Sequence, residues 1–338
     1  MTFPSAYPFI IAEMSGNHNQ SLDRALAIVD AAADAGVHAI KLQTYTADTM
    51  TLPGVMTITD PQSPWYRREL YELYEEAHTP WEWHSPLFER AKERGIIAFS
   101  TPFDETAVDF LEQLDCPLYK IASFENNHLP LLKKVAATGK PVILSTGITT
   151  LSELDEAVQT LREGGCKDLT LLKCTSTYPA SQKNSNLATL PHLKALFQCR
   201  VGLSDHTLGI GVAVASIALG AQVIEKHFTL SRAEGGVDSS FSLEPSEMTA
   251  LVTECQRADL ALGTVQYGIQ PAEQKSLLFK RSIYTNASVR AGTKLTEANI
   301  KIIRPGYGLA PKYYEQILGK TVNRNLEKGE PLSWECLG

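Results

Sequence analysis

The sequence lacks several patterns that would place it in common classes of protein. Its six cysteines form no Cys-x-x-Cys pair, which gives little support to a zinc ribbon or a disulfide framework and favours reduced, buried thiols. No apolar run approaches the roughly 18 residues that a membrane-spanning helix needs. The N-terminal stretch also lacks the basic and long apolar regions of a secretory signal. These absences predict a cytoplasmic protein with no membrane contact.

An excess of basic residues is also missing. The chain has 31 Lys and Arg against 38 Asp and Glu, a formal net charge of −7. Such a chain is a poor partner for nucleic acid, so the positive charge for any anionic ligand must be gathered locally. Neither a Gly-x-Gly-x-x-Gly nor a P-loop pattern occurs. The absence of both disfavours a nucleotide-binding open sheet.

What the sequence does have is a regular alternation of strand and helix patterns. Eight short apolar runs separated by helical patterns are each expected to form a strand; they span 9–15, 39–45, 96–102, 118–124, 141–147, 169–175, 200–206 and 222–228. Several helical segments end in glycine, as at Gly36 and Gly95, because glycine accepts the left-handed conformation that closes a helix. Eight strand–helix units predict a (β/α)8 TIM barrel over residues 1–263.

The pattern changes after a last barrel helix expected over 244–263. Residues 264–281 are predicted to be a linker, and 282–338 a compact, β-rich domain with short strands and one short helix. In this domain Arg304 stands beside a Pro-Gly-x-Gly turn. A stiff, exposed turn is a suitable place to present a cation to an anion.

Polar residues gather at the predicted carboxyl ends of the strands, where barrel enzymes carry their chemistry. Lys41 and Lys120 interrupt otherwise apolar strands, and a buried, unpaired ammonium group is costly. A salt bridge to a neighbouring strand would explain one such lysine. Two lysines among strand-end hydroxyls favour an anion site instead. Those hydroxyls include Thr101, Ser123, Ser145 and Ser204.

Two histidines, His206 and His227, end consecutive predicted strands. Neighbouring strands lie about 4.8 Å apart, so both imidazoles can hold one divalent ion and leave positions open for water and substrate. Mn²⁺ and Mg²⁺ suit such a site equally. Alternatively each histidine hydrogen-bonds a carboxylate, or one is a general base. Glu13 could add a ligand or an orienting carboxylate. A metal beside an anion site suggests joining a phosphorylated acid to a carbonyl compound.

A set of ordered motifs resembles the sialic acid synthase family. They are IAEMSGNH, IKLQTYT, STPFD, YKIAS, ILSTG, CTSTYP, GLSDHT and IEKHFT, followed by RPGYGL, which resembles that family's C-terminal antifreeze-like (SAF) domain. The resemblance covers essentially the whole chain. Within the family, residues 67–96 resemble the pseudaminic acid synthase branch.

This resemblance implies a metal-dependent condensation. Phosphoenolpyruvate would join 2,4-diacetamido-2,4,6-trideoxy-L-altropyranose, as its open-chain aldehyde, to give pseudaminic acid and phosphate. An alternative within the family is an N-acetylneuraminate or legionaminic acid synthase acting on an N-acetylmannosamine-type sugar. The two differ at the sugar's carbon 6, where a methyl group wants an apolar wall and a hydroxyl wants a polar partner.

The resemblance also assigns roles residue by residue. Catalytic roles fall to Glu13, Lys41, Lys120 and Asp238, and metal binding to His206 and His227. The substrate-binding residues would be Gln43, Thr101, Ser123, Ser145, Tyr178, Ser204 and Arg304. It further implies a domain-swapped homodimer, in which the tail domain crosses to the partner barrel and 264–281 is the hinge.

Some features depart from this interpretation or compete with it. Ser176 stands where the sialic branch often has Asn, which weakens transfer of a sugar contact to that position. Trp81, Trp83 and His84 either pack a helix N-terminus or belong to a specificity loop. A carbohydrate- or ice-binding protein has no need of the histidine pair. A Schiff-base aldolase would be revealed by borohydride trapping of Lys41 or Lys120.

Overall fold

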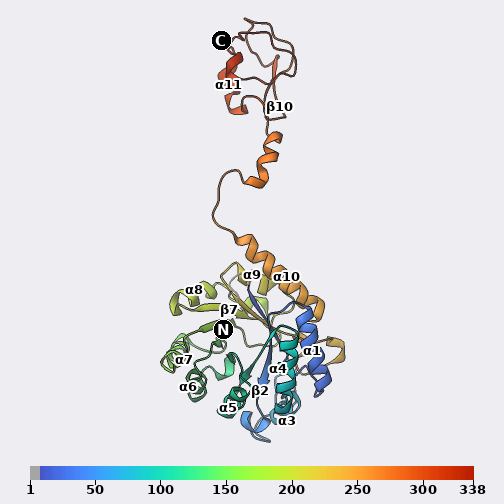
Figure 1. Cartoon of the computed structure of the whole chain (residues 1–338), viewed down its shortest axis with the longest axis vertical. Coiled ribbons are helices and arrows are strands. Elements are labelled where there is room, and N and C mark those ends of the chain that lie inside the picture. The colour runs from blue at the N-terminus through green and yellow to red at the C-terminus, as the bar shows by residue number, and fades with distance from the viewer. Residues whose placement is uncertain (1–7) are drawn as a thin grey trace. The chain divides into compact units, whose positions relative to one another are not determined.

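The computed structural model describes residues 8–338, so the start of the N-terminal stretch searched for a signal lies outside the described residues. The chain divides into two compact units, Met1–Gly263 and Thr264–Gly338 (Figure 1). Each unit has its own hydrophobic core, and each is described separately below.

The first unit is a closed barrel of eight parallel strands in chain order, which confirms the predicted (β/α)8 fold. The strands are β1 (Phe9–Glu13), β2 (Ala39–Thr44), β3 (Ile97–Pro102), β4 (Tyr119–Ile121), β5 (Val142–Ser145), β6 (Leu169–Cys174), β7 (Arg200–Ser204) and β8 (Val223–His227). Closure pairs β1 with β8, so that Glu13 lies opposite both Lys41 and His227 in the register. The first and last strands therefore bring their polar ends together.

Helices surround this barrel (Figure 1). They are α1 (Leu22–Asp34), α2 (Ala47–Met50), α3 (Leu70–Ala77), α4 (His84–Glu93), α5 (Glu105–Gln113), α6 (Leu129–Ala137), α7 (Leu151–Glu163), α8 (Thr189–Phe197), α9 (Gly211–Ile217) and α10 (Pro245–Leu262). Their starts follow ordinary capping chemistry. At α7, for example, Thr150 and Glu153 form a reciprocal capping box.

All eight strands are shorter than their apolar runs predict, and in β4 and β7 the difference affects polar residues at the strand end. β4 ends at Ile121 because Ser123–Glu125 turns into a short 3-10 helix. β7 ends at Ser204, so His206 lies in the loop after the strand, not on it. Both differences place polar residues at the carboxyl end of the barrel on loops, where they can turn toward a ligand.

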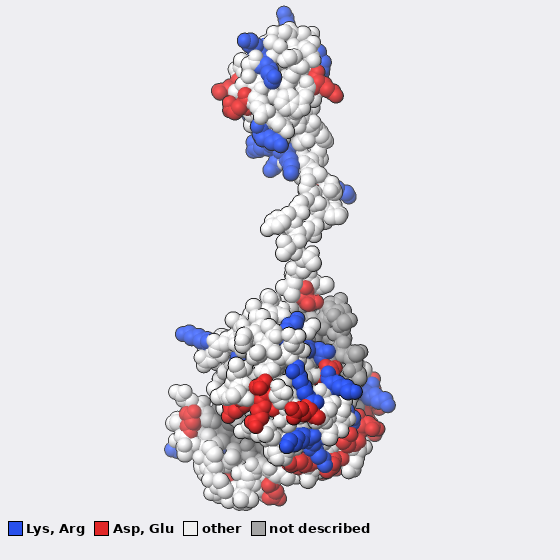
Figure 2. All heavy atoms as spheres, turned by 90° about the vertical axis from the view of Figure 1, so that its left-hand side faces the viewer, with Lys and Arg blue, Asp and Glu red and all other residues white. Residues whose placement is uncertain are grey.

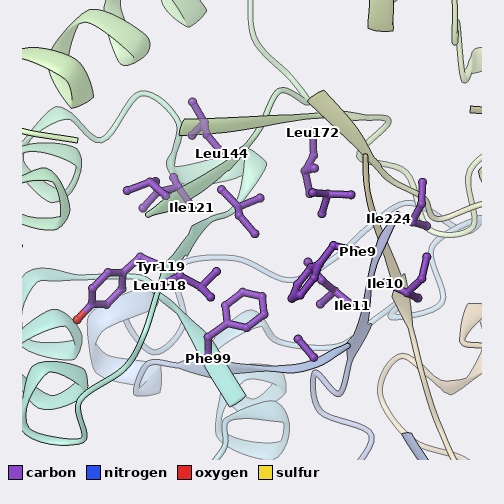
Figure 3. Close-up of a cluster of buried hydrophobic side chains, with 14 of the residues drawn as sticks. Phe9, Ile10, Ile11, Phe99, Leu118, Tyr119, Ile121, Leu144, Leu172 and Ile224 are labelled. Atoms are coloured by element: carbon purple, nitrogen blue, oxygen red, sulfur yellow. The ribbon is translucent and has the colours of Figure 1, made fainter. Parts of the chain in front are cut away.

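Apolar side chains fill the barrel below these polar ends. Figure 3 shows buried side chains from several strands, including Phe9, Phe99 and Leu172, converging in the interior. Tyr119 is buried too, but its hydroxyl donates to Glu112 on α5, 2.5 Å away. The packed interior gives the strand ends a rigid support.

The second unit is small and contains one antiparallel strand pair. It comprises β9 (Ser282–Thr285), β10 (Ile300–Ile303), the short helix α11 (Tyr314–Ile317) and a 3-10 segment, Pro271–Phe279. Ile283, Leu295 and Leu332 are among its fully buried residues. Arg304 directly follows β10 and is exposed.

The surface of the barrel unit mixes both signs of charge. On the face seen in Figure 2, acidic and basic side chains are interspersed, with no continuous basic stripe on that face. Within residues 8–338, no helix combines the length and apolar character needed to cross a membrane.

Candidate active site

A cavity of about 470 Å³ lies at the carboxyl ends of the barrel strands. That volume is within the roughly 300–1,000 Å³ typical of small-molecule sites. Its lining includes the last residues of several strands, among them Glu13, Ser145, Cys174, Ser204 and His227. The remaining lining comes largely from the long connection between β2 and α4. The barrel therefore supplies a polar wall and this connection supplies much of the rest.

Two lysines and two glutamates form a buried cluster in the polar wall. The Lys41 ammonium nitrogen lies 2.8 Å from Glu13 Oε2 and 3.4 Å from Glu225 Oε1. The Lys120 ammonium nitrogen also lies 3.4 Å from Glu225 Oε1. Thr101 accepts a hydrogen bond of 3.2 Å from Lys41. Each lysine thus has a carboxylate partner, and both still line the cavity.

The four groups of this cluster differ in how firmly they hold charge. Although burial favours the neutral acid, Lys120 and Lys41 lower the pKa of Glu225 to about 2. Burial raises the pKa of Glu13 against the opposing effect of Lys41. Despite burial, Glu13 and Glu225 raise the pKa of Lys41, whereas burial lowers the pKa of Lys120. A bound anion would favour the charged form of Lys120.

Three serine hydroxyls surround the lysines along the cavity wall. Ser204 donates to Glu225 at 3.2 Å, and Ser123 accepts from the Gly147 amide at 3.1 Å. A Cβ added at Gly147 would come within 2.6 Å of the Ser123 hydroxyl, so glycine is needed there. The Ser145 hydroxyl is buried and has no hydrogen-bond partner in residues 8–338. It is free to bind a ligand oxygen.

The two histidines lie side by side, with ring centroids 5.4 Å apart. His206 Nδ1 donates to the Thr175 carbonyl at 3.0 Å, which leaves Nε2 with its lone pair. His227 Nδ1 is buried without a hydrogen bond in the described part of the chain. Burial, followed by the positive field of His206, lowers the pKa of His227 well below its ordinary value. Despite burial, a hydrogen bond to Cys174 raises the pKa of His206.

A second network joins β1 to the loop after β8. Ser15 donates to Asp238 Oδ2, and Gln43 donates to Glu13 at 2.8 Å and to Ser15 at 3.1 Å. Asp238 Oδ2 lies 3.7 Å from His227 Nδ1. Burial raises the pKa of Asp238 to about 6, although the Ser15 bond opposes the shift. Asp238 can therefore change protonation near neutral pH.

Most residues singled out from the sequence meet in this cavity. Those that line it are Glu13, Lys41, Gln43, Lys120, Ser123, Ser145, Tyr178, Ser204, His206, His227 and Asp238. Thr101 does not line the cavity, but its hydroxyl accepts a hydrogen bond from Lys41, which does. Arg304 belongs to the second unit, and its role stays a prediction. Ser176, the position of departure, is not among the lining residues and sits close to Gly147.

Sequence reasoning missed three acidic lining residues, Glu225, Glu125 and Asp60. Glu225 was visible at a strand end, but its bond to Lys120 joins strands that are not neighbours in the barrel. Glu125 also lines the cavity with a buried, unpartnered Oε2 among the described residues. Burial raises its pKa to about 7, although Lys120 opposes the shift.

The aromatic cluster before α4 packs the barrel wall. Trp81 stacks on Phe110 with centroids 4.6 Å apart. His84 is buried and lies 2.8 Å from the Thr44 hydroxyl. Trp81, Trp83 and His84 do not line the cavity, which favours the packing interpretation over a specificity loop.

Comparison with known proteins agrees with this geometry. The model of the NeuB family matches residues 28–267, and the SAF domain model matches 280–338. A pseudaminic acid synthase of Campylobacter jejuni subsp. jejuni serotype O:2 is 43% identical, covering 96% of this chain and 95% of its own. One from Helicobacter pylori is 41% identical, covering 96% of each chain.

Other relatives share the fold and much of the sequence. An N,N'-diacetyllegionaminic acid synthase of Campylobacter jejuni subsp. jejuni serotype O:2 is 36% identical over 95% of this chain and 97% of its own. The structure of an N-acetylneuraminic acid synthetase from Leptospira borgpetersenii in complex with citrate has a TM-score of 0.73. It is 32% identical and covers 82% of this chain and 94% of its own. The chain belongs to the NeuB family of phosphoenolpyruvate-dependent nonulosonic acid synthases.

Proposed function

We propose that this enzyme is a pseudaminic acid synthase. It would condense phosphoenolpyruvate with 2,4-diacetamido-2,4,6-trideoxy-L-altropyranose to give pseudaminic acid and phosphate. The similarity to two pseudaminic acid synthases over nearly the whole chain supports this choice. The observation that carries it is the cavity itself, where two buried lysines and a free serine hydroxyl face two adjacent histidines.

The lysine end suits the anionic substrate. Lys41 and Lys120 would bind the carboxylate and phosphate of phosphoenolpyruvate, with Ser123, Ser145 and Ser204 donating to the remaining oxygens. Charge-assisted hydrogen bonds of this kind are the strong ones. Burial lowers the pKa of Lys120, and an anion bound beside it would raise that pKa by favouring the charged ammonium form.

The histidine end suits a divalent metal ion, Mn²⁺ or Mg²⁺. In residues 8–338, no three His, Cys, Asp or Glu side chains cluster as a self-sufficient metal site. The chain would therefore supply His206 and His227, and water and substrate the other ligands. Among the described residues His227 Nδ1 is buried without a hydrogen bond, and Asp238 Oδ2 lies 3.7 Å away, so the nitrogen is available to a ligand. When bound, the ion supplies Lewis-acid polarisation of the aldehyde oxygen.

The remaining chemistry falls to the chain's own carboxyl groups. C3 of phosphoenolpyruvate bonds to the aldehyde carbon, the aldehyde oxygen gains a proton, and C2 becomes electron-poor. Water then adds to C2 and loses one proton. The bond between C2 and the bridging oxygen breaks, phosphate leaves with that oxygen, and the C2 hydroxyl gives its proton to phosphate as the keto group forms. Glu13, whose pKa burial raises, is placed by Gln43 and Lys41 to hold a transferred proton. Asp238, with a pKa of about 6, would contact the sugar.

A legionaminic or N-acetylneuraminate synthase is the second candidate, because the legionaminic relative is 36% identical. Phosphate release should be measured with phosphoenolpyruvate and, in turn, the altro sugar, N-acetylmannosamine and the sugar substrate of legionaminic acid synthases, with and without EDTA. Release that requires the altro sugar and stops with EDTA is expected. Release with N-acetylmannosamine instead would move the enzyme to another branch. No release with any of them, or borohydride trapping of Lys41 or Lys120 with pyruvate, would overturn the proposal.

We also propose that the enzyme works as a domain-swapped homodimer, in which Arg304 reaches the partner's cavity. Arg304→Ala should weaken phosphoenolpyruvate binding by roughly 1.5–3 kcal/mol, as for a lost charge-assisted contact. Chains carrying His227→Ala and chains carrying Arg304→Ala should be co-expressed. Mixed dimers would then show the wild-type KM for phosphoenolpyruvate, because one cavity per dimer has both residues. Mixed dimers that keep the raised KM of Arg304→Ala would place Arg304 over its own barrel or outside the site.

A further inference from the structure

A hairpin between β2 and α3, residues 56–70, forms one side of the cavity. Its two arms are joined by backbone hydrogen bonds from Ile58 N to Arg68 O, from Arg67 N to Ile58 O and from Leu70 N to Met56 O, at 2.8–2.9 Å. Thr57 and Glu69 form an antiparallel bridge. The hairpin is therefore an ordered wall with a defined inner and outer face.

Alternate residues of the first arm face the cavity. Met56, Ile58 and Asp60 line it, whereas Val55, Thr57 and Thr59, which alternate with them, do not. This is the two-residue period of extended backbone, in which successive side chains point to opposite sides. Val55 is 66% exposed. Two neighbouring apolar side chains, Met56 and Ile58, are thus presented inward by the arm itself.

Trp65 anchors the second arm beside the histidines. Its indole nitrogen donates to the Val237 carbonyl at 2.9 Å, next to Asp238. Its ring lies 5.6 Å from that of Tyr178, and the Tyr178 ring lies 4.4 Å from that of His206. One aromatic ring therefore separates the hairpin from the end of the cavity assigned to the aldehyde.

We propose that Met56 and Ile58 form the apolar wall that receives methyl groups of the sugar and selects a 6-deoxy sugar over one with a 6-hydroxyl. This inference rests on the proposed function. With phosphoenolpyruvate at the lysines and the aldehyde at the histidines, the rest of the sugar would extend toward the remaining lining, of which the hairpin forms one side. The altro sugar carries three methyl groups, one at carbon 6 and two in its acetamido groups.

The chemistry of the wall discriminates in both directions. A methyl group against Met56 and Ile58 gains by leaving water. A hydroxyl placed there loses its hydrogen bonds to water and finds no partner on either side chain. The polar lining residues of the hairpin, Asp60 and Ser63, lie nearer its turn. They are available to the acetamido N–H groups.

The test compares Ile58→Thr with Val55→Thr. Both replace a β-branched apolar side chain on the same arm by one with a hydroxyl, and only the first faces the cavity. For wild type and each variant, kcat/KM is measured with the altro sugar and with N-acetylmannosamine at saturating phosphoenolpyruvate. Ile58→Thr should shift the ratio of the two values toward N-acetylmannosamine by about 10- to 100-fold, the range for one methyl-sized contact. The KM for phosphoenolpyruvate should stay unchanged.

The outcomes separate this inference from the proposed function. An active wild type with the same ratio in Ile58→Thr and Val55→Thr would overturn the wall and leave the function standing. A wild type that uses neither sugar, or only N-acetylmannosamine, would overturn both. If Ile58→Thr does not fold, as judged by its thermal transition, Met56→Gln decides, since Met56 is 52% exposed and tolerates the change.

Discussion

The Glu225 carboxylate lies 3.4 Å from the Lys120 ammonium nitrogen, although 105 positions separate the two residues in the chain. They come from β8 and β4, which are not hydrogen-bonded neighbours in the barrel. The same oxygen lies 3.4 Å from Lys41. A single buried carboxylate thus bridges the two lysines across the interior, which explains how both remain buried.

Removal of this carboxylate should destabilise the barrel and change its response to anions. Glu225→Gln leaves two buried lysines with Glu13 alone, and breaking a buried pair costs roughly 3–5 kcal/mol. Inorganic phosphate should then raise the thermal transition of the variant more than that of wild type, because the anion replaces the lost charge. Thermal unfolding at several phosphate concentrations measures both effects.

Glu112→Gln provides the matched control. Glu112 also pairs with a lysine, Lys140, at 2.5 Å, but both side chains are partly exposed and lie outside the cavity. Glutamine still offers an acceptor to the Tyr119 hydroxyl, so loss of the charge should cost about 1 kcal/mol or less and leave the phosphate response unchanged. An equal response in the two variants would show that Glu225 does not hold the lysines for an anion.

Loss of a proposed metal ligand should weaken metal binding before anything else. His227→Ala should lower Mn²⁺ affinity on the order of 100-fold or more, since only two protein ligands are proposed. Titration followed by electron paramagnetic resonance measures this without turnover. The exposed His192 on α8 supplies the control His192→Ala, which should bind Mn²⁺ as wild type does. Unchanged affinity in His227→Ala would remove it from the site.

Lys226 should act as a positioning residue for His206. It stands between Glu225 and His227 in β8, and its side chain is buried. Its ammonium group donates to Asp205 at 3.0 Å, to the Thr207 carbonyl at 2.5 Å and to the Gly209 carbonyl at 2.9 Å. These contacts hold the loop on both sides of His206. Lys226→Met should lower Mn²⁺ affinity about 10- to 100-fold. The KM for phosphoenolpyruvate should change much less.

Lys226→Arg tests whether the hydrogen bonds of Lys226, and not its side-chain volume, hold the loop around His206. Arginine keeps a positive charge and several donors, so it should restore part of the Mn²⁺ affinity lost in Lys226→Met. Equal affinity in Lys226→Met and wild type would leave Lys226 with a packing role only.

Glu125 should make stability fall as pH rises toward neutrality. Burial raises its pKa to about 7 from an ordinary 4.5, so the folded state favours the neutral acid. Its contribution is complete below pH 4.5 and is lost as pH rises through 7. Glu125→Gln removes this dependence. As pH rises from 4.5 to 8, the unfolding free energy of Glu125→Gln should therefore increase relative to that of wild type, on the order of 3 kcal/mol.

Urea unfolding across this pH range measures the effect. Glu153→Gln is the comparison variant, because its difference in unfolding free energy from wild type should change with pH in the opposite direction. Backbone and side-chain hydrogen bonds from Thr150 lower the pKa of the exposed Glu153, so its contribution is lost as pH falls, not as it rises. A constant difference between wild type and Glu125→Gln would mean that Glu125 is not buried as a neutral acid.

Local patterns sufficed for the barrel and for most of its polar strand ends. Each strand run is a local signal, and closure of the barrel then brings Glu13, Lys41 and His227 together. Partners across the interior are not local. Nothing near Lys120 in the sequence indicates Glu225, and the end of β7 before His206 depends on how the loop folds.

The 56–70 hairpin was missed for a similar reason. Its alternation of Met56, Ile58 and Asp60 is present in the sequence. Three residues of period two are a weak signal, however, and the contacts of Trp65 with Val237 and Phe241, which tie the hairpin to the connection after β8, have no local signal in the sequence.

That two-residue period makes the wall sensitive to backbone length as well as to side-chain identity. Insertion of one residue before Val55 would slip the arm by one position and turn its outer face inward. Val55, Thr57 and Thr59 would then replace Met56, Ile58 and Asp60, exchanging a thioether, an alkyl group and a carboxylate for an alkyl group and two hydroxyls. If Met56 and Ile58 form the proposed wall, such an insertion would therefore change the sugar preference in a single step.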